Sequence, residues 1–319
     1  MEKKKVIISY RLLDEGLEKL KETFDVTMPR EQSFSREELI ELLPLHDAML
    51  CNFNLKVDKE LIDAGKDRLK LISNYAVGFN NIDTEYAKQK GIAVCNTPDP
   101  VIEPTAELAY ALMGSAARRI AEVDRKLRTP GSLKWGTLEN LGQGLYGKTL
   151  GIFGLGRIGE AIARRATAGG MNIIYHNRHE NKEAAEKFNA KFCSKDQLLE
   201  NSDYVMLSVP LTTETRHLID GDALAKMKKT AILVNIARGP VVDELALAEA
   251  LKNKTIGGAA LDVFENEPQI TPALLKLDNI VMTPHCGTST RDARIAMARM
   301  ASDNIINFFG GQGRVCRVV

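Results

Sequence analysis

The sequence predicts an α/β protein with two doubly wound domains, and three observations support this. Short apolar runs of strand length alternate with amphipathic stretches of helical length, an order typical of parallel sheets with helices on both faces. The chain has 319 residues, more than one hydrophobic core usually takes. A loop rich in Pro and Asn at residues 96–100 separates two such series, so we expect a domain break near residue 100.

The first series supplies the elements of the first domain. Ser35 and Glu38 form a capping-box pattern, which predicts the start of a helix that ends near Leu43. An amphipathic stretch predicts another helix over residues 12–23. Strands are expected at residues 6–9, 25–27, 48–51, 69–73 and 92–95.

The second series follows a long helical stretch, which predicts one helix from Pro104 to about Arg128. Pro104 fits there because proline is tolerated in the first turn of a helix. A last helix is expected over residues 291–309. Strands are expected at residues 149–153, 172–175, 204–209, 231–235, 258–261 and 279–282.

The composition excludes several classes of protein. With 27% charged residues and a net charge of +1, the chain has no basic excess for nucleic acid, and no apolar stretch approaches a membrane span. The short run Val6-Ile7-Ile8 is too short for a signal peptide. The five cysteines lack CxxC spacing and indicate reduced thiols. We therefore expect a cytoplasmic protein with no metal, nucleic-acid or membrane partner.

A GxGxxG motif follows the apolar strand that begins the second series. Gly154 would allow a tight turn, Gly156 would let the backbone approach a pyrophosphate, and Gly159 would let helix and strand pack closely. The N–H groups of Arg157 and Ile158 would face that anion at the helix N-terminus. This arrangement predicts a Rossmann-like dinucleotide site; the alternative is a glycine-rich turn without a ligand.

The next strand bears on the choice between NAD and NADP. A carboxylate usually stands at its end and accepts hydrogen bonds from the ribose hydroxyls of NAD. Here the strand ends in Tyr-His-Asn-Arg, and the nearest carboxylate is Glu180. Asn177 and Arg178 are suited to bind a 2′-phosphate. We therefore predict that NADP is preferred over NAD; the alternative is that Arg178 is an ordinary surface residue.

Three motifs that each follow an apolar run resemble a known enzyme family. Residues 234–239 are Val-Asn-Ile-Ala-Arg-Gly, residues 262–268 are Asp-Val-Phe-Glu-Asn-Glu-Pro, and residues 283–285 are Thr-Pro-His. In order and spacing they resemble the C-terminal signatures of the D-isomer-specific 2-hydroxyacid dehydrogenases, closest to the glyoxylate/hydroxypyruvate and 2-ketogluconate reductases. The resemblance covers nearly the whole chain. It implies a catalytic cleft between the two domains and a homodimer.

The chemistry of 2-keto acid reduction requires these residue types. A hydride that reaches the carbonyl carbon leaves negative charge on oxygen, and His285 can supply the proton. A carboxylate beside the imidazole would orient it and favour its protonated form; the family pattern favours Glu267, and Glu265 is the rival. Arg238 can bind the substrate carboxylate and carbonyl through two prongs. The other four histidines are expected to be structural or surface groups.

The resemblance implies roles for further residues. Residues 75–83 resemble the family's carboxylate-binding loop, in which the N–H groups of Val77 and Gly78 hold the substrate beside Arg238 and His285. Asp262 corresponds to the residue that holds the nicotinamide amide. The other residues expected to contact the cofactor are Thr105, Pro210, Thr215, Ile236, Ala237 and Gly287. Trp135 is expected to pack against the protein or to border the pocket.

The resulting prediction is a dehydrogenase of two domains. Residues 1–100 and 289–319 would form the substrate domain, and residues 101–288 the dinucleotide-binding domain. The enzyme would transfer a hydride between NAD(P)H and C2 of a small 2-keto or 2-hydroxy acid. One alternative is an NAD-linked dehydrogenase of the D-lactate type. Another is an NAD(H)-sensing binding protein, since the C-terminal-binding-protein corepressors resemble this family.

Overall fold

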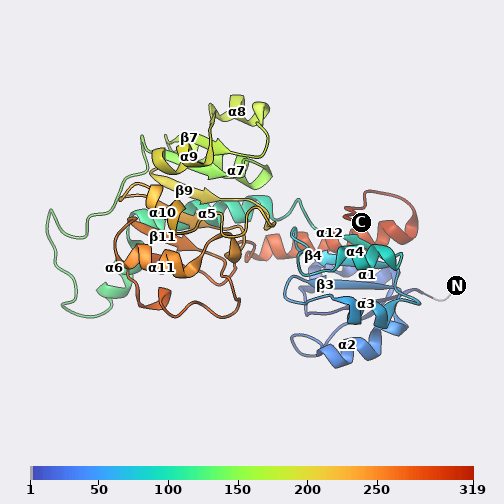
Figure 1. Ribbon diagram of the computed structural model, residues 1–319. Helices are drawn as coiled ribbons and strands as arrows, with labels where there is room; N and C mark the ends of the chain where they lie inside the picture. Colours follow the sequence, from blue (N-terminus) through green and yellow to red (C-terminus); the bar gives the residue numbers. More distant parts are fainter. Residues whose placement is uncertain (1–2) are drawn as a thin grey trace. The chain divides into compact units, whose positions relative to one another are not determined.

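The computed structural model describes residues 3–319, which form two parallel sheets covered by helices (Figure 1). The chain divides into two compact units. Unit 1 contains the residues up to Pro104 together with Thr288–Val319, and unit 2 contains Thr105–Gly287. The breaks expected from the sequence were after residues 100 and 288. Residues 1 and 2 of the expected first domain lie outside the described residues.

Unit 1 is built on a five-stranded sheet with the strand order β2-β1-β3-β4-β5, and every pairing is parallel. Ser35 and Glu38 form the expected capping box at the start of α2. The strands are β1 (Lys5–Ile8), β2 (Asp25–Thr27), β3 (Ala48–Asn52), β4 (Leu71–Tyr75) and β5 (Ala93–Cys95). The helices are η1 (Asp14–Gly16), α1 (Glu18–Thr23), α2 (Arg36–Leu42), η2 (Leu43–Leu45), α3 (Lys59–Gly65), α4 (Thr84–Gln89) and α12 (Arg291–Gly310).

Both faces of the unit 1 sheet are buried, as a doubly wound fold requires. On one face Met49 and Ile72 share a core with Leu39 of α2 and Leu61 of α3. On the other face α12 crosses the sheet, and the Tyr75 hydroxyl donates to the carbonyl of Arg294 at 2.7 Å.

Unit 2 is built on a seven-stranded sheet with the order β12-β11-β10-β9-β6-β7-β8, again parallel throughout. The strands are β6 (Thr149–Phe153), β7 (Asn172–His176), β8 (Lys191–Phe192), β9 (Tyr204–Leu207), β10 (Ile232–Asn235), β11 (Gly258–Leu261) and β12 (Ile280–Met282). The helices are α5 (Ile102–Ala117), which begins in unit 1, α6 (Ile120–Leu127), α7 (Arg157–Ala168), α8 (Lys182–Phe188), α9 (Lys195–Asn201), α10 (Gly221–Lys226), η3 (Gly239–Val241), α11 (Glu244–Lys252) and η4 (Leu274–Lys276).

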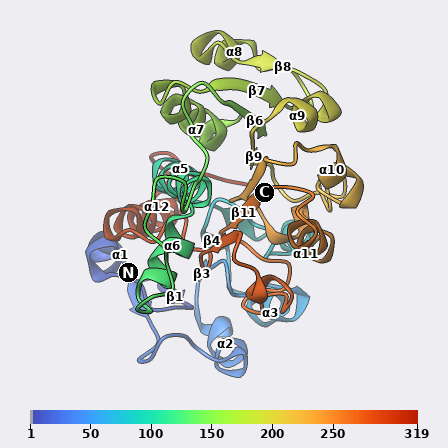
Figure 2. The same ribbon diagram turned by 90° about the vertical axis from the view of Figure 1, so that its left-hand side faces the viewer.

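Helices cover both faces of the unit 2 sheet (Figure 2). On one face Phe153 of β6 shares a core with residues of α9, α10 and α11. On the other face α7 lies against β6, and a Cβ on Gly159 would be in van der Waals contact with Ile152 at 3.5 Å. Because the chain runs from β6 outward in both directions, the sheet has a switch point between β6 and β9, where α/β proteins bind ligands. The predicted α/β fold class is confirmed.

The prediction of a single helix from Pro104 to Arg128 is wrong, because the chain forms two helices there, α5 and α6. Arg119 has a left-handed φ of +54°, and the Ala117 carbonyl accepts instead from the N–H of Gln143 at 2.7 Å. The Arg119 guanidinium donates to the carboxylate of Glu122. This bond and the nearby Lys126 ammonium lower the pKa of the Glu122 carboxyl to about 2. A tertiary contact therefore ends the helix where the local pattern would continue it.

The segment after α6, drawn in green in Figure 1, carries several large apolar side chains that are exposed. Trp135 is 87% exposed, so the expectation that it packs is wrong within this chain, and Leu138 and Tyr146 are 81% and 85% exposed.

None of the described helices is long and apolar enough to cross a membrane.

Candidate active site

The glycine motif lies at the switch point of the unit 2 sheet. Gly154 has a φ of +93°, and a Cβ there would lie 2.5 Å from the carbonyl oxygen of Ser208, the first residue after β9. A Cβ on Gly159 would lie 2.2 Å from the oxygen of Gly154. Both positions therefore require glycine. A Cβ on Gly156 would meet no atom within 4 Å, so the protein itself does not fill the space before Arg157 and Ile158 of α7. This cradle fits a dinucleotide phosphate.

Two asparagines brace the glycine motif from the end of β7. The N–H of Leu155 donates to Oδ1 of Asn177 at 2.7 Å, and Nδ2 of Asn181 donates to the Leu155 carbonyl at 3.0 Å. Sequence reasoning missed Asn181, although it caps α8 and carries the signal of an N-cap residue. The amide of Asn177 is therefore engaged within the protein.

Arg178, the next residue, is exposed. The Thr212 hydroxyl and, more weakly, the Arg178 guanidinium lower the pKa of the exposed Glu214 carboxyl. A carboxylate therefore lies within electrostatic reach of Arg178.

Arg238, Glu267 and His285 follow β10, β11 and β12, which are neighbours in the unit 2 sheet. The carboxyl ends of parallel strands meet at one edge, and this brings the three side chains to the same edge. Nδ1 of His285 lies 2.8 Å from Oε2 of Glu267, and the two side chains are 28% and 32% exposed. The pair is accessible to a small molecule while remaining partly shielded from water.

The rival carboxylate, Glu265, pairs with a different histidine. Its Oε1 lies 2.9 Å from Nε2 of His217. Two separate His–Glu pairs are therefore found within residues 3–319, and Glu267 is the carboxylate that contacts His285. Of the other histidines, His46 is buried and hydrogen-bonded to Leu42, and burial lowers its pKa.

The surroundings favour the ionised form of Glu267. Burial acts to raise the pKa of this carboxyl, but the hydrogen bond and charge of His285, the N–H of Phe264 and the charge of Arg238 outweigh burial and hold the pKa below its ordinary value. The Phe264 N–H donates to Oε1 at 2.9 Å. Because an ionised carboxylate can only accept, Nδ1 of His285 is the donor in this contact.

Arg238 is partly buried, and burial lowers the pKa of its guanidinium while the Glu267 charge acts to raise it. A guanidinium nevertheless stays charged in proteins. Nη1 donates to the Ala237 carbonyl at 2.6 Å, which folds the side chain back along its own strand end. The turn is further held by Asn235, whose Nδ2 donates to the carbonyl of Arg238 at 3.0 Å.

Asp262 builds the turn that carries His285. It is 2% exposed, and its carboxylate accepts from the N–H groups of Cys286 at 2.8 Å and Gly287 at 2.9 Å and from the Thr283 hydroxyl at 2.6 Å. His285 has a left-handed φ of +50°, a strained conformation that these bonds hold in place. Sequence reasoning missed this role, because the three partners lie more than twenty residues away.

The remaining residues expected to contact the cofactor lie in unit 2. Thr105 of α5 is buried, and a Cβ on Gly287 would lie 3.4 Å from its hydroxyl oxygen. Ile236 and Ala237 are buried after β10. The Thr215 hydroxyl donates to the Pro210 carbonyl at 2.6 Å and so shapes the turn after β9.

In unit 1, the loop after β4 turns its carbonyls toward the protein. Nδ2 of Asn96 donates to the Val77 carbonyl at 2.8 Å, and Nδ2 of Asn74 donates to the Gly78 carbonyl at 2.8 Å. Within residues 3–319, the N–H groups of Val77 and Gly78 donate no hydrogen bond to the protein. Two adjacent free N–H groups are suited to bind a carboxylate.

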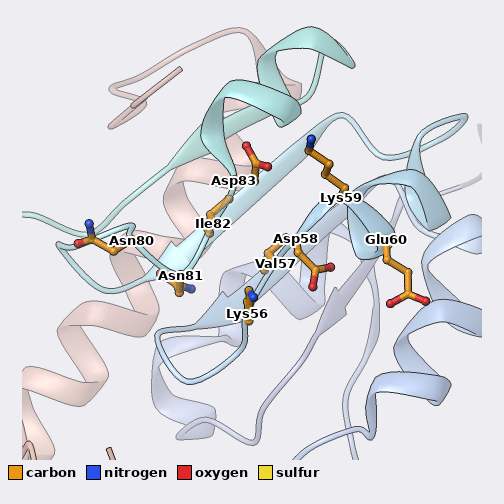
Figure 3. A pocket seen from close by; sticks show the side chains of 9 residues that line it. All are labelled: Lys56, Val57, Asp58, Lys59, Glu60, Asn80, Asn81, Ile82 and Asp83. Carbon is orange, nitrogen blue, oxygen red and sulfur yellow. The ribbon is translucent and has the colours of Figure 1, made fainter. Parts of the chain in front are cut away.

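A cavity of about 540 Å³ lies beside this loop in unit 1, lined by residues 56–60 and 80–83 (Figure 3). Its charged side chains are of both signs, from Lys56 and Lys59 to Asp58, Glu60 and Asp83. It includes neither Val77 nor Gly78, and none of the three unit 2 residues lines it. We assign this cavity no part in the chemistry.

Comparisons with known proteins identify the family. Residues 110–287 match the family described as D-isomer specific 2-hydroxyacid dehydrogenase, NAD binding domain. The chain is 44% identical to a glyoxylate reductase of Thermococcus kodakarensis over 313 residues, 97% of this chain and 94% of the relative. Two solved structures are also similar. One is a glyoxylate reductase from Paecilomyes thermophila (TM-score 0.90, 34% identity, 100% and 99% of the two chains). The other is an NADPH-dependent glyoxylate/hydroxypyruvate reductase from Sinorhizobium meliloti in complex with NADP and malonate (TM-score 0.85, 30% identity, 100% and 97%).

The matched region contains the glycine motif and all three residues at the strand ends. The relatives match over nearly their whole length as well as that of this chain. The chain therefore belongs to the D-isomer specific 2-hydroxyacid dehydrogenase family and is an NAD(P)-dependent oxidoreductase with a Rossmann-type NAD-binding domain.

Proposed function

We propose that this enzyme reduces small 2-keto acids, glyoxylate first among them, with Arg238, Glu267 and His285 as its catalytic residues. The observation that carries the proposal is the 2.8 Å contact between His285 and Glu267 at the strand edge that also carries Arg238. The names of the relatives support glyoxylate as substrate. Unit 1 would be the substrate domain and unit 2 the dinucleotide-binding domain.

In the proposed reaction each residue has one task. The nicotinamide, when bound, supplies or accepts the hydride. His285 donates its proton to the carbonyl oxygen as negative charge develops there, and Glu267 holds the imidazole protonated and oriented. Arg238 binds the carboxylate and polarises the carbonyl. The free N–H groups of Val77 and Gly78 are the proposed carboxylate-binding groups of unit 1.

A turnover assay tests the proposal. The purified protein is incubated with NADPH or NADH and with glyoxylate, hydroxypyruvate, 2-ketogluconate and pyruvate in turn, and loss of the reduced cofactor is followed by absorbance. We expect glyoxylate to give the highest kcat/KM. Preference for pyruvate with NADH would favour the D-lactate-type alternative, and lack of turnover with every acid would contradict the proposal.

The pH dependence of reduction is expected to report the Glu267–His285 pair. Reduction requires protonated His285, so activity falls as rising pH removes that proton. E267Q keeps the shape of the side chain but removes the charge that stabilises the imidazolium. The alkaline limb of the kcat/KM profile should therefore move to lower pH, by about one unit.

E265Q is the matched control, because it removes a carboxylate two residues closer to β11, one that contacts His217 rather than His285. E265Q should leave the alkaline limb of the kcat/KM profile at the wild-type pH. A limb that moves in E265Q and stays in E267Q would identify Glu265 as the functional partner.

We propose further that the enzyme prefers NADPH. No carboxylate stands directly at the end of β7, where the nearest in sequence is Glu180, and Arg178 is exposed there, within reach of a 2′-phosphate. Asn177 would support cofactor binding indirectly, by holding the glycine motif in place, since its side-chain amide is bound to the backbone of Leu155. The residues that would hold the rest of the cofactor are Thr105, Gly154, Gly156, Arg157, Ile158, Gly159, Pro210, Thr215, Ile236, Ala237, Asp262 and Gly287.

The kcat/KM with NADPH is expected to exceed that with NADH by at least about tenfold. This is the gain in affinity that one charge-assisted hydrogen bond between Arg178 and the 2′-phosphate would give. R178A should remove most of this difference by weakening NADPH and should leave NADH nearly unchanged. R30A, which removes an exposed arginine from unit 1, is the control and should leave the ratio unchanged. A wild-type enzyme that prefers NADH would show that Arg178 does not select the cofactor.

The exposed segment after α6 supports a homodimer. Trp135, Leu138 and Tyr146 are each more than four-fifths exposed, an apolar surface that a single chain leaves in water. We infer that this surface is covered by a second copy. Sedimentation velocity that shows a single chain at micromolar concentration would contradict the inference.

The cysteines support a cytoplasmic location, because all five are free thiols and two of them, Cys51 and Cys95, are buried. Fractionation of the source cells would test this, and recovery of the enzyme outside the cytoplasm would contradict it.

A further inference from the structure

Glu244, the first residue of α11, is a buried carboxylate that the reaction does not use. It is 3% exposed, and within the described residues no lysine or arginine lies within ion-pair distance of it. Burial of a carboxylate without a cation is costly unless several donors satisfy its oxygens. The position at a helix N-terminus accounts for part of that compensation. The rest comes from the loop after β11.

The two oxygens of Glu244 hold the two ends of one loop. Oε1 accepts from the N–H of Glu265 at 2.6 Å, and Oε2 accepts from the hydroxyl of Thr271. The N–H of Glu244 donates in return to Oε1 of Glu265 at 3.4 Å. A single carboxylate thus fixes the start and the end of the segment 265–271.

Glu267 lies between these two anchor points. The residues from Asn266 to Gln269 are exposed, so packing does little to hold them. Glu267 is itself stretched between two partners, the N–H of Phe264 at 2.9 Å and the imidazole of His285 at 2.8 Å. A shift of about 1 Å in the loop would break the second contact, since hydrogen bonds lengthened by that much are lost.

The start of the loop is also fixed against the strand end that carries Arg238. A Cβ on Gly239 would lie 1.8 Å from the carbonyl carbon of Phe264, so the two backbones are in direct contact. Phe264 is 5% exposed and belongs to the core of unit 2. The Phe264 end therefore has backbone and core support. At the Thr271 end, the side chain is bound, within the described part of the chain, only to Glu244, while the Thr271 carbonyl accepts from the N–H of Leu274 at 3.0 Å and Ile270 is partly buried.

We propose that Glu244 is a positioning residue, which holds the loop 265–271 so that the Glu267 carboxylate meets His285. The inference rests on the proposed roles of Glu267 and His285. Glu244 touches neither of them and acts through the backbone of Glu265 and the hydroxyl of Thr271.

The charged and titratable groups around Glu244, Glu267 and His285 come from several elements. Glu265 and His217 lie beside Glu244, and Arg238 acts on Glu267 by its charge. Cys286 adjoins His285 on the turn after β12, and Asp262, which follows β11, binds that turn. The variants below leave all five in place, so a change in the pH profile is assigned to the loop.

The test is the pH profile of reduction in E244Q and T271V, measured beside E267Q. Gln at position 244 can accept at only one of its two atoms, and Val at position 271 removes the hydroxyl. Each variant is expected to move the alkaline limb of kcat/KM to lower pH by about half a unit, against about one unit for E267Q. In the double variant E244Q/E267Q the limb should move no further than in E267Q alone, because the two changes act through one contact.

E122Q is the matched control for the loss of a buried carboxylate. Glu122 of α6 is 8% exposed and binds Arg119 and Lys126, away from the loop 265–271. E122Q should lower the melting temperature and leave the alkaline limb in place. T271V carries the test if E244Q fails to fold.

The outcomes separate the two hypotheses. If E267Q moves the limb while folded E244Q or T271V leaves it at the wild-type pH, the positioning role is wrong and the proposed function stands. A shift in the double variant equal to the sum of the single shifts would likewise contradict the positioning role. If E267Q itself leaves the limb unchanged, the Glu267–His285 assignment fails, and the inference fails with it.

Discussion

H285A is expected to lower kcat/KM for reduction by about 10²–10⁴-fold, the usual contribution of a general acid. The imidazole is the proton donor in the proposed reaction, and Ala leaves Glu267 ionised but unable to donate. The Kd for NADPH, measured from the quenching of protein fluorescence, should stay within about twofold of the wild-type value. The reason is that the glycine motif lies at the end of β6, whereas His285 follows β12.

H217A provides an unusually close control. His217 also contacts a glutamate, at 2.9 Å, and also has a left-handed φ, +49° against +50° for His285. Ala at either position removes a His–Glu pair and a strained histidine, so any effect of those losses is common to both variants. H217A should retain wild-type turnover within about threefold. Equal losses in the two variants would show that structure, and not proton donation, explains the effect of H285A.

R238A is expected to raise KM for the keto acid and to lower kcat, with a combined loss in kcat/KM of about 10³-fold or more. The guanidinium binds the carboxylate in the ground state and stabilises the charge that develops on the carbonyl oxygen in the transition state. Loss of both interactions therefore affects binding and chemistry together. Steady-state kinetics with glyoxylate measure the two parameters separately.

R238K should recover only part of the loss, because Lys keeps the charge but lacks the two-pronged geometry. R165A is the control for removal of a part-buried arginine in unit 2. Arg165 donates to the Ala161 carbonyl at 3.0 Å and its side chain is 20% exposed. R165A should lower stability with little change in KM for the keto acid. Near-wild-type kinetics in R238A would contradict the role of Arg238.

The sequence predicted the elements whose reasons are local. The capping box at Ser35 depends on side chains within a few residues of the helix start, and it is confirmed. The strand 149–153 and the strand 258–261 are also confirmed, since buried parallel strands are apolar on both faces. The long helix from Pro104 failed because the Gln143 N–H, far along the chain, takes the Ala117 carbonyl.

The sequence by itself determined the family, the α/β fold class and the residue types of the candidate site, because glycines at a tight turn and polar residues after apolar strands leave a readable pattern. Only the tertiary structure decided which carboxylate meets which histidine. Glu265 and Glu267 are two residues apart and equally acidic, and no local rule separates them. The loop that carries them turns one toward His217 and the other toward His285. That choice depends on Glu244 and Gly239, whose contacts form only when strands distant in sequence become neighbours in the sheet.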